Sequence, residues 1–335
     1  MAEFCVKSAL TIYMKIESIG ELGLIERIKS KVNHYPKGVV RGIGDDAAVL
    51  EYDKNNYILF TTDALADNVH FSLKYFKPWQ IGMKAIEQNA SDIAAMGGIP
   101  KYAVVSLALP GNIDTEFVDK LYGGMNKKCR KYGISIVGGN ITHSKDIAIN
   151  AAMLGTVEKK YLALRSGAKV GDLIFCSGDV GKSNAGLELL KHDLKGKSIR
   201  KHLEPQARLD LARKLVKIGI NSMIDVSDGV ASEIRHICKK SKVGAVIYAD
   251  KIPISKNTIK GSKKLKKNAL DFALYGGEDF ELVFTANKNK LIQLKNLDVS
   301  VIGKIVNRKN GIKLVKDNKK LNLESSFDHF RRLRV

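Results

Sequence analysis

The acidic residues of this chain gather in short loops that also carry glycine, serine or threonine. The loops are GIGDDAAVL (42–50), TTDALADNVHF (61–71), NASDIAAMGG (89–98), DVSDG (225–229) and YGGEDFEL (275–282). Any one of them could be an ordinary turn or helix cap, because Asp and Gly are common at both. Together they supply the carboxylate and hydroxyl oxygens that hard divalent cations prefer, and magnesium typically combines a few carboxylates with substrate phosphates. The pattern favours a site for a magnesium–nucleotide complex.

A further motif, SGDVGKS (177–183), is similar to a phosphate-binding P-loop but does not keep its spacing. The pattern G-x-x-x-x-G-K-[ST] needs a glycine five residues before Gly181, where this chain has Cys176, and Gly178 comes two places too late. The segment follows an expected strand and precedes an expected helix, so a backbone nest for an anion stays open. We do not assign it as a P-loop.

Alternating strand-like and helix-like pieces must position these loops, and they predict an α/β or α+β architecture. The expected helices cover residues 79–96, about 114–132 with Asp114 as N-cap, 185–191 and 206–218, with another after DVSDG. The expected strands cover residues 57–60, 102–109, 134–137, 147–157, 173–176, 245–249 and 281–285. On the helix over 79–96, Asp92 shares a stripe with small and polar residues, so it can face a site. The polar stretch LRSGAKVGD (164–172) predicts a boundary near residue 160, between domains at 14–160 and 161–335.

The chain is strongly basic. Its 335 residues include 56 Lys and Arg against 35 Asp and Glu, a formal net charge of +21, with lysine runs such as KNTIKGSKKLKKN (256–268). Such an excess can indicate a nucleic-acid partner. Lysine outnumbers arginine, however, and the runs are not interleaved with aromatic residues and contain no nucleic-acid-binding motif. We therefore expect a solvated lysine-rich surface that helps to attract anionic substrates, and no nucleic-acid partner.

The sequence predicts a cytoplasmic protein that does not associate with membranes. No apolar run approaches the roughly 20 residues that cross a bilayer, and the first stretch, MAEFCVKSALTIYMK, lacks a signal-peptide pattern. Met14 begins a more ordinary opening, so residues 1–13 are read as an N-terminal extension or the product of an early start codon. The cysteines, Cys5, Cys129, Cys176 and Cys238, have no CxxC or zinc-site spacing and are expected to be reduced and mostly buried.

Seven motifs, taken in order, resemble those of one enzyme family. They are GIGDDAAVL, TTDALADNVHF, NASDIAAMGG, RSGAKVGD, DVSDG, GGEDFEL and the terminal FDHF, spread from about Ile19 to Phe330. The set resembles the thiamine-monophosphate kinase family of the aminoimidazole ribonucleotide synthetase-like superfamily. The resemblance implies a kinase that passes the γ-phosphate of ATP in line to thiamine monophosphate with several Mg²⁺ ions, the last step of thiamine diphosphate biosynthesis. It also implies a two-domain α/β (α+β) fold, in which the sheet of the N-terminal ATP- and metal-binding domain pairs across a homodimer and a C-terminal α/β domain completes the active site.

The resemblance also assigns roles to residues by position. The magnesium ions would be held by oxygen ligands from Asp46, Thr61, Thr62, Asp63, Asp92, Asn140, Asp225 and Asp228, with Asp45 as a close neighbour. ATP would contact Tyr122, Gly139, Asn140, Arg165 and Ser227. Thiamine monophosphate would contact His70, Glu278 and Phe327. Catalysis would depend on Asp46, Asp63 and Arg165.

Two positions depart from the pattern of the family. Asn140 stands where many members have aspartate, and its neutral carbonyl oxygen would bind magnesium more weakly than a carboxylate. Phe327 stands where some members have tyrosine or tryptophan, which keeps a stacking face for the substrate but removes a polar group.

The implied chemistry suits these residue types. A phosphate monoester carries roughly −1.5 to −2 charge at neutral pH and is nucleophilic without a base, so no catalytic histidine is expected. The obstacle is the repulsion between acceptor and triphosphate, which bound cations and Arg165 can relieve.

Two alternatives stay open. An aminoimidazole ribonucleotide synthetase-like enzyme would also use ATP, but its glycine-rich signatures differ from those found here. A basic nucleic-acid-binding protein would explain the charge of +21 but not the aspartate-rich loops, which repel a phosphate backbone.

Overall fold

The computed structural model of the chain describes residues 15–32 and 37–323. The described residues divide into two units, 15–32 in the first and 37–323 in the second. The described part of the first unit is helix α1 (Ile16–Lys31), whose regular backbone is interrupted at Gly20, where φ is 67°. The second unit contains both β-sheets and every candidate site residue that the structure describes.

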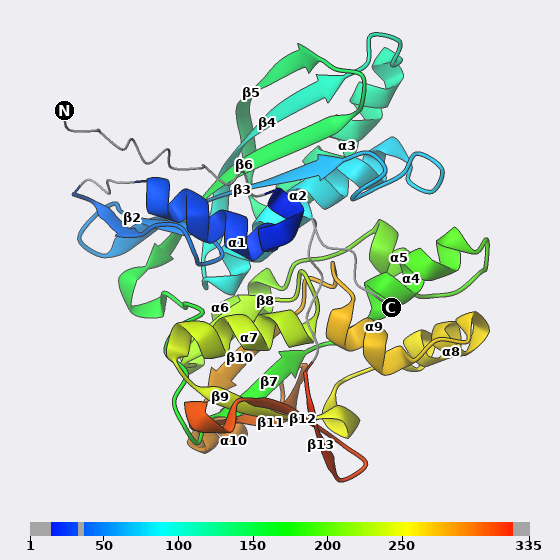
Figure 1. Cartoon of the computed structure of the whole chain (residues 1–335). Coiled ribbons are helices and arrows are strands. Elements are labelled where there is room, and N and C mark those ends of the chain that lie inside the picture. Colours follow the sequence, from blue (N-terminus) through cyan, green and yellow to red (C-terminus); the bar gives the residue numbers. More distant parts are fainter. Residues whose placement is uncertain (1–14, 33–36, 324–335) are drawn as a thin grey trace, which may run out of the picture. The chain divides into compact units, whose positions relative to one another are not determined.

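The first sheet has the strand order β1-β2-β3-β6-β4-β5 (Figure 1). Its strands are β1 (Val39–Arg41), β2 (Ala48–Glu51), β3 (Asn56–Ala66), β4 (Ile99–Leu109), β5 (Ser135–His143) and β6 (Ala148–Glu158). All neighbouring strands are antiparallel except β4 and β5. Parallel neighbours need a crossover connection, and helix α3 (Thr115–Tyr132) supplies it here. Helix α2 (Pro78–Ala95) connects β3 to β4 and packs against β3 and β6.

Helix α2 is buried on nearly all sides, because it also contacts α3, α6 (Leu209–Ile218) and a strand of the second sheet. Its polar residues therefore need partners inside the protein. Glu87, for example, pairs with Lys128 Nζ at 2.5 Å and accepts hydrogen bonds from the Tyr132 hydroxyl at 2.9 Å and the Ala207 N–H at 2.6 Å. Polar residues of this helix outside the predicted stripe of Asp92 thus also have partners inside the protein.

The second sheet has the strand order β13-β12-β9-β11-β7-β10-β8 and is antiparallel except between β9 and β12. Its strands are β7 (Leu173–Ser177), β8 (Ser222–Asp225), β9 (Gly244–Tyr248), β10 (Leu282–Ala286), β11 (Val299–Val306), β12 (Ile312–Lys316) and β13 (Lys319–Asn322). The other helices are α4 (Lys182–Lys191), α5 (Ile199–Leu203), α7 (Val230–Ser241), α8 (Lys256–Leu265), α9 (Ala269–Tyr275) and α10 (Leu291–Leu294). Short 3₁₀ turns cover Lys159–Tyr161, Ala249–Lys251, Lys288–Lys290 and Arg308–Asn310.

Two apolar clusters hold the second unit together. The larger one joins the first sheet, α2 and α3 to one face of the second sheet, where the rings of Phe175 and Phe284 stack with centroids 4.9 Å apart. The smaller one, which includes Ile224 and Val283, fills the opposite face of the second sheet. Strands buried on both faces read as continuous apolar runs, which is why LIFCS (173–177) and LVFTA (282–286) are visible in the sequence.

Most predicted elements are confirmed within a few residues, and the long helices α2 and α3 agree best. The sequence reasoning missed the strands β1, β2, β8, β11, β12 and β13 and the helices α1, α5, α8, α9 and α10, of which α8 lies inside the lysine run. The boundary near residue 160 stays a prediction, although the first sheet ends at Glu158 and the second begins at Leu173. Cys129, Cys176 and Cys238 are free and buried, as expected, while Cys5 lies outside the described residues. Within residues 15–32 and 37–323, no helix has the length and apolar character needed to cross a membrane.

Two neighbouring glycines of α3 offer a matched test of the packing between α2 and α3. A Cβ atom on Gly124 would lie 1.9 Å from the Trp79 carbonyl oxygen at the start of α2, whereas one on Gly123 would meet nothing within 4 Å. We expect Gly124→Ala to lower the free energy of unfolding by about 3 kcal/mol, and Gly123→Ala to raise it by about 0.5–1 kcal/mol. Urea unfolding of both variants measures this difference, and equal stability of the two would contradict the close helix contact.

Candidate metal and substrate site

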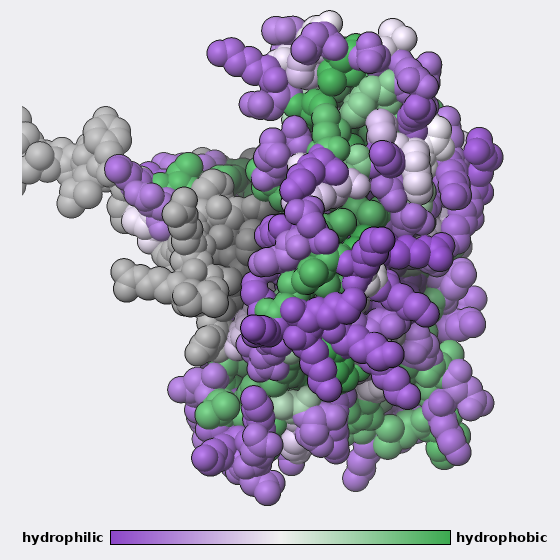
Figure 2. All heavy atoms as spheres, turned by 90° about the vertical axis from the view of Figure 1, so that its right-hand side faces the viewer, coloured by the Kyte–Doolittle hydropathy of each residue, from purple (hydrophilic) through white to green (hydrophobic). Residues whose placement is uncertain are grey.

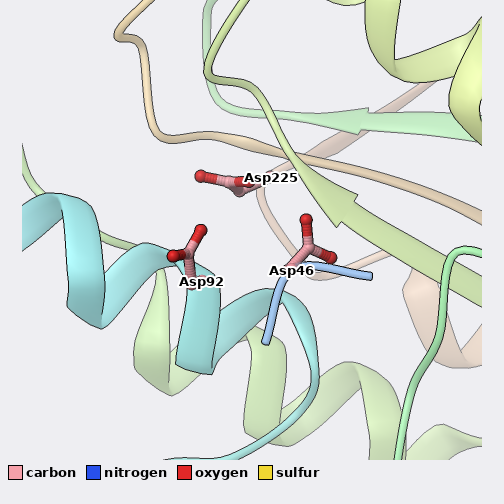
Figure 3. A group of neighbouring side chains, drawn as sticks. All are labelled: Asp46, Asp92 and Asp225. Carbon is pink, nitrogen blue, oxygen red and sulfur yellow. The ribbon is translucent and has the colours of Figure 1, made fainter. Parts of the chain in front are cut away.

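Three carboxylates from distant parts of the chain meet in the second unit. Asp46 lies in the loop between β1 and β2, Asp92 on α2, and Asp225 at the end of β8. Each offers an oxygen within 4.8 Å of the others, and Figure 3 shows the three side chains turned toward a common space. The structure thus brings together loops that the sequence analysis singled out separately.

Burial makes this arrangement electrostatically unfavourable without a cation. Loss of solvation, followed by the charge of Asp46, raises the pKa of Asp225 to about 7. Loss of solvation, followed by the charge of Asp63, raises the pKa of Asp92 well above its usual value. The pKa of Asp63 rises to about 6 through loss of solvation and the nearby charge of Asp228. Asp63 and Asp228 therefore belong to the same acidic group, which we call the acidic cluster: Asp46, Asp63, Asp92, Asp225 and Asp228.

Arg165 is the counter-charge of this cluster. Its Nε and Nη2 donate to Asp46 Oδ1 at 3.0 and 2.6 Å, and its backbone N–H donates to Asp45 Oδ1 at 2.9 Å. The other oxygen of Asp46, Oδ2, is buried and has no hydrogen-bond partner within the described part of the chain. A buried carboxylate oxygen without a partner is costly, and a bound cation would satisfy it. The donor set therefore fits a hard divalent cation.

The two threonines of β3 point in opposite directions, because side chains alternate along a strand. Thr61 joins the acidic cluster, where its hydroxyl donates to Asp92 Oδ2 at 2.5 Å. Thr62 lies on the other face of the sheet, where its hydroxyl donates to Asn150 Oδ1 at 2.9 Å. Within one chain, the Thr62 hydroxyl therefore lies on the opposite side of the sheet from Thr61 and Asp63.

Two residues of this site escaped the sequence reasoning. Ser91 donates from its hydroxyl to Asp225 Oδ2 at 2.6 Å. Glu233, in the first turn of α7, is 2% exposed and accepts a hydrogen bond from the Asp228 N–H at 3.0 Å. Loss of solvation and the charge of Asp228 raise the pKa of Glu233 well above its usual value. Their positions, next to Asp92 and just after DVSDG, were the available signal.

The two predicted substrate residues, His70 and Glu278, are joined by a lysine. Lys84 of α2 is fully buried, and its Nζ contacts Glu278 Oε1 and the His70 carbonyl oxygen, each at 2.5 Å. His70 Nδ1 accepts a hydrogen bond from the Ala66 N–H at 3.1 Å. Loss of solvation works to raise the pKa of Glu278, but the charge and hydrogen bond of Lys84, together with His202 and His70, outweigh it and lower that pKa. The sequence reasoning missed Lys84, which has no distinguishing motif.

His202 of α5 lies on the other side of Glu278. Its Nδ1 is 3.4 Å from Glu278 Oε2 and 3.1 Å from the Ser183 hydroxyl. Burial, followed by the charge of Lys84, lowers the pKa of His202 to about 4, so the ring is neutral at neutral pH. The Glu278 loop is also tied to the DVSDG loop, because the Glu278 N–H donates to the Ser227 carbonyl oxygen at 2.8 Å.

The remaining residues predicted to contact ATP lie away from the acidic cluster, as the pairing of the strands shows. Asn140 is exposed on β5, paired with Ser106 of β4, and Gly139 precedes it. Ser106 pairs in turn with Asn150 of β6, on the face of the sheet opposite to Thr61 and Asp63. Tyr122 is half-buried on α3 and packs against the larger apolar cluster. Phe327 lies outside the described residues.

The P-loop-like segment binds a carboxylate of its own chain. The backbone N–H groups of Gly181 and Ser183 donate to Asp279 Oδ2 and Oδ1, at 2.5 and 2.8 Å. These are the groups that a P-loop would offer to phosphate. The nest that the sequence left open is therefore occupied by Asp279.

Known proteins match almost the whole chain. Residues 44–157 match the family "AIR synthase related protein, N-terminal domain", and residues 169–316 match "AIR synthase related protein, C-terminal domain". The thiamine-monophosphate kinase of Aquifex aeolicus (strain VF5) is 37% identical over 298 residues, which cover 87% of this chain and 93% of the relative. The chain belongs to the thiamine-monophosphate kinase family.

Other members of the family agree in sequence and in fold. The thiamine-monophosphate kinase of Bacillus subtilis (strain 168) is 34% identical over 328 residues, which cover 93% of this chain and 99% of the relative. The solved structure of AaThiL complexed with AMPPCP and TMP superposes with a TM-score of 0.85 at 35% identity, covering 95% of this chain and 100% of that chain. The two-part mixed α/β fold expected from the motifs is thereby confirmed.

Replacing a repelling carboxylate should stabilise the metal-free protein. The pKa of Asp225 is about 7 when folded and roughly 3.9 when unfolded. The proton bound to Asp225 therefore stabilises the fold fully below about pH 4, and this stabilisation is lost as the pH rises through 7. In EDTA at pH 8 we expect Asp225→Asn to raise the free energy of unfolding by about 2 kcal/mol, with a smaller gain at pH 5. The variant should also gain less stability from added Mg²⁺ than the wild type.

Thermal unfolding at both pH values, with EDTA or Mg²⁺, checks this expectation. Asp250→Asn is the control, because Asp250 is exposed and lies in the 3₁₀ turn after β9. A lower melting temperature of Asp225→Asn than of the wild type at pH 8 in EDTA would contradict the repulsion described for the acidic cluster.

Proposed function

We propose that this chain transfers the γ-phosphoryl group of ATP to thiamine monophosphate, forming thiamine diphosphate. Membership of the thiamine-monophosphate kinase family and the match to AaThiL complexed with AMPPCP and TMP support this reaction. The observation that carries it is the acidic cluster, which lies next to Arg165 and draws carboxylates from both sequence halves. We propose the cytoplasm as the place of the reaction, as expected for an enzyme that consumes ATP.

Magnesium is the cation that we propose for the acidic cluster. Asp46, Asp92 and Asp225 would hold it, with Asp63, Asp228 and the Thr61 hydroxyl as further oxygen ligands. When bound, it supplies the positive charge that offsets the repulsion between two phosphate groups. Magnesium prefers oxygen ligands and is usually held by one or two carboxylates together with substrate phosphates, so this number of carboxylates suits several Mg²⁺ ions.

The chain's own groups have separate tasks in this proposal. Arg165, fixed by Asp46, orients toward the phosphates and stabilises charge that develops on the transferred group. Asp46, Asp63 and Arg165 are thus the residues on which we expect turnover to depend. No side chain has to remove a proton, because the acceptor oxygen already carries charge at neutral pH.

His70 and Glu278 are proposed to contact thiamine monophosphate, with Phe327 as a stacking partner. Lys84 holds the Glu278 carboxylate in its ionised form and in one orientation. An ionised carboxylate can accept hydrogen bonds from the amine of the aminopyrimidine ring. Lys84 is therefore a positioning residue in this proposal.

We propose that the chain forms a homodimer through the outer face of the first sheet. The outer face is the one that carries Thr62 and Asn150, opposite to Thr61 and Asp63. Large apolar side chains are exposed there on three neighbouring strands: Phe60 by 45%, Tyr102 by 52%, Val104 by 42% and Leu154 by 37%. An exposed apolar patch of this kind marks an interaction surface. A second copy would cover it.

The same pairing would give Thr62 and Asn140 a role. Both lie on the outer face, but β6 and β4 separate their strands, which places them about 14 Å apart at the usual strand spacing. One ion cannot bridge that distance within one chain. We propose that Asn140, with Gly139, approaches the nucleotide bound by the second copy, while Tyr122 and Ser227 remain proposed contacts to ATP.

The reaction is tested by measuring ADP release from ATP and Mg²⁺ with thiamine monophosphate as acceptor. Thiamine and formylglycinamidine ribonucleotide serve as control acceptors. We expect turnover only with thiamine monophosphate, together with formation of thiamine diphosphate. Turnover with the purine precursor instead would assign the chain to another reaction.

The acceptor contact is tested through Glu278 and Lys84. We expect Glu278→Gln to raise the KM for thiamine monophosphate more than the KM for ATP. Lys84→Met should do the same and also lower the free energy of unfolding by about 3 kcal/mol, because it leaves a carboxylate unpaired. The double variant should recover most of the stability but not the KM, which separates positioning from folding. An unchanged acceptor KM in Glu278→Gln would remove this role.

The dimer is tested by placing a charge on the outer face of the first sheet. We expect Val104→Glu to shift the protein from dimer to monomer in sedimentation velocity and to lower kcat. Ile292→Glu is the matched control, because Ile292 is 86% exposed but lies on α10. Dissociation by both variants, or by neither, would argue against this interface.

A further inference from the structure

A basic cavity of about 650 Å³ lies between α3, α5 and the segment after α5. Eight Lys or Arg side chains and three carboxylates line it, and Met83 is the one apolar residue among them. None of its lining residues belongs to the acidic cluster, and none is a proposed contact to ATP or thiamine monophosphate. Figure 2 shows mostly hydrophilic side chains on the side where Figure 1 draws α5.

The cations of this basic cavity exceed its carboxylates. Lys182 pairs with Asp179 at 3.2 Å, and Arg200 lies 3.6 Å from Glu204. The third carboxylate, Glu281, is shared by Lys201 and Arg208, and two partners lie outside the lining, Asp298 for Arg208 and Glu87 for Lys128. The surplus consists of Lys127, Lys131 and Lys197, which have no carboxylate partner among residues 37–323.

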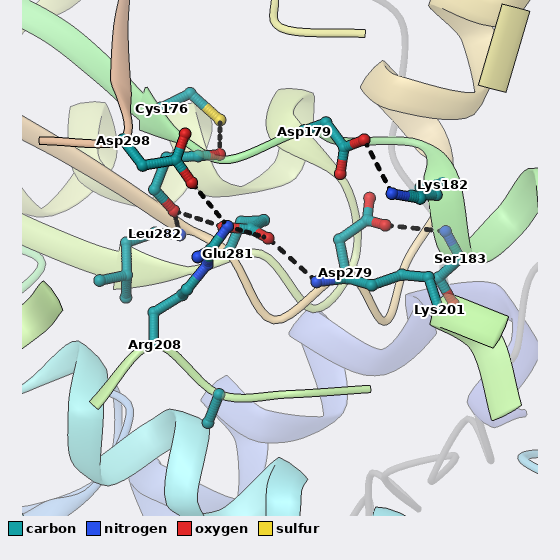
Figure 4. A network of polar contacts seen from close by, with 12 residues as sticks. Cys176, Asp179, Lys182, Ser183, Lys201, Arg208, Asp279, Glu281, Leu282 and Asp298 are labelled. Atoms are coloured by element: carbon teal, nitrogen blue, oxygen red, sulfur yellow. Dashed lines mark hydrogen bonds and ion pairs between the residues drawn. The ribbon is translucent and has the colours of Figure 1, made fainter. Parts of the chain in front are cut away.

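Two of the cations are held rigidly, unlike lysines on a free surface. Glu281 is 1% exposed, and its oxygens pair with Lys201 Nζ at 2.9 Å and with Arg208 Nε at 2.6 Å (Figure 4). The Ser177 hydroxyl also donates to Glu281 Oε2 at 2.6 Å. A buried carboxylate with several donors fixes both cations toward the basic cavity, which reduces the entropy lost when they bind an anion.

The crowding of positive charge extends to the α3 side. Partial burial lowers the pKa of Lys131, and the repulsion from Lys128 adds to this lowering, while the charges of Glu87 and Asp210 work against it. A lysine that gains an anionic partner escapes this repulsion. The wall of α3 therefore also favours an anionic occupant.

We propose that the basic cavity is a second anion site, which binds a small molecule carrying two or more phosphate groups. Several cations converge from different elements, which matches the many oxygens of a diphosphate or triphosphate. Its volume is within the range of small-molecule sites. A nucleic acid fits less well, because single strands are bound by stacking on aromatic side chains and none lines this cavity.

Isothermal titration of the full-length chain with pyrophosphate and with ADP, both in EDTA, tests the site. Without a divalent cation the acidic cluster repels phosphate, so binding there does not interfere and the test is independent of kinase activity. We expect the tighter of the two ligands to bind at one site per chain. Which of them binds more tightly shows whether the site recognises free pyrophosphate or the diphosphate of a nucleotide. Lys131→Gln with Lys197→Gln should weaken binding by about tenfold for each lysine.

Lys145→Gln with Lys309→Gln is the matched control, because both lysines are exposed and lie outside the basic cavity. The control should bind like the wild type, and both double variants should keep the kcat of the wild type. Absence of binding would overturn the proposal, and so would an equal loss in the two double variants, which would indicate general attraction to a basic chain. Displacement of pyrophosphate by a short RNA of higher affinity would identify a nucleic-acid surface instead.

Discussion

Mutual repulsion among buried carboxylates is the constraint on which the arrangement of this protein depends. Asp46, Asp92 and Asp225 are brought within reach of one another although burial raises the pKa of each carboxyl and neighbouring carboxylates raise those of Asp92 and Asp225 further. The apolar clusters of the two sheets must supply the stability that this group removes. Arg165 offsets only part of the negative charge, because both hydrogen bonds of its guanidinium group go to one oxygen of Asp46. The fold is thus strained electrostatically where a cation fits.

Helix α2 shows how one buried element can serve several sites. Its length of 18 residues places Lys84 near its middle, against Glu278, and Ser91 with Asp92 about two turns further on, near its C-terminal end and at the acidic cluster. Met83, next to Lys84, reaches the wall of the basic cavity. Because α2 is packed on nearly all sides, these side chains cannot shift independently. The spacing between the proposed metal and acceptor sites is therefore set by a rigid helix.

The residues that sequence reasoning found and those it missed differ in how their positions are determined. Asp46, Asp92 and Asp225 stand in loops or at element ends with local signals, and the structure brings them together. Lys84 lies within a helix, and only the packing of the Glu278 loop gives it a partner. Thr61 and Thr62 look equivalent in the sequence TTD, yet strand alternation sends them to opposite faces. Period-two patterning over the whole of β3 could have separated them, but only four of its eleven residues were predicted as strand.

The structure also shows where part of the net charge of +21 is concentrated. The chain places the negatively charged acidic cluster and the positively charged basic cavity in the same compact unit. A phosphate compound without a cation is repelled by the first and attracted by the second, whereas a magnesium–phosphate complex can enter the first. Lys201 and Arg208 line the basic cavity, and the adjacent His202 lies beside Glu278 of the proposed acceptor site. Helix α5 and the segment 278–281 thus contribute side chains both to the basic cavity and to the proposed acceptor site.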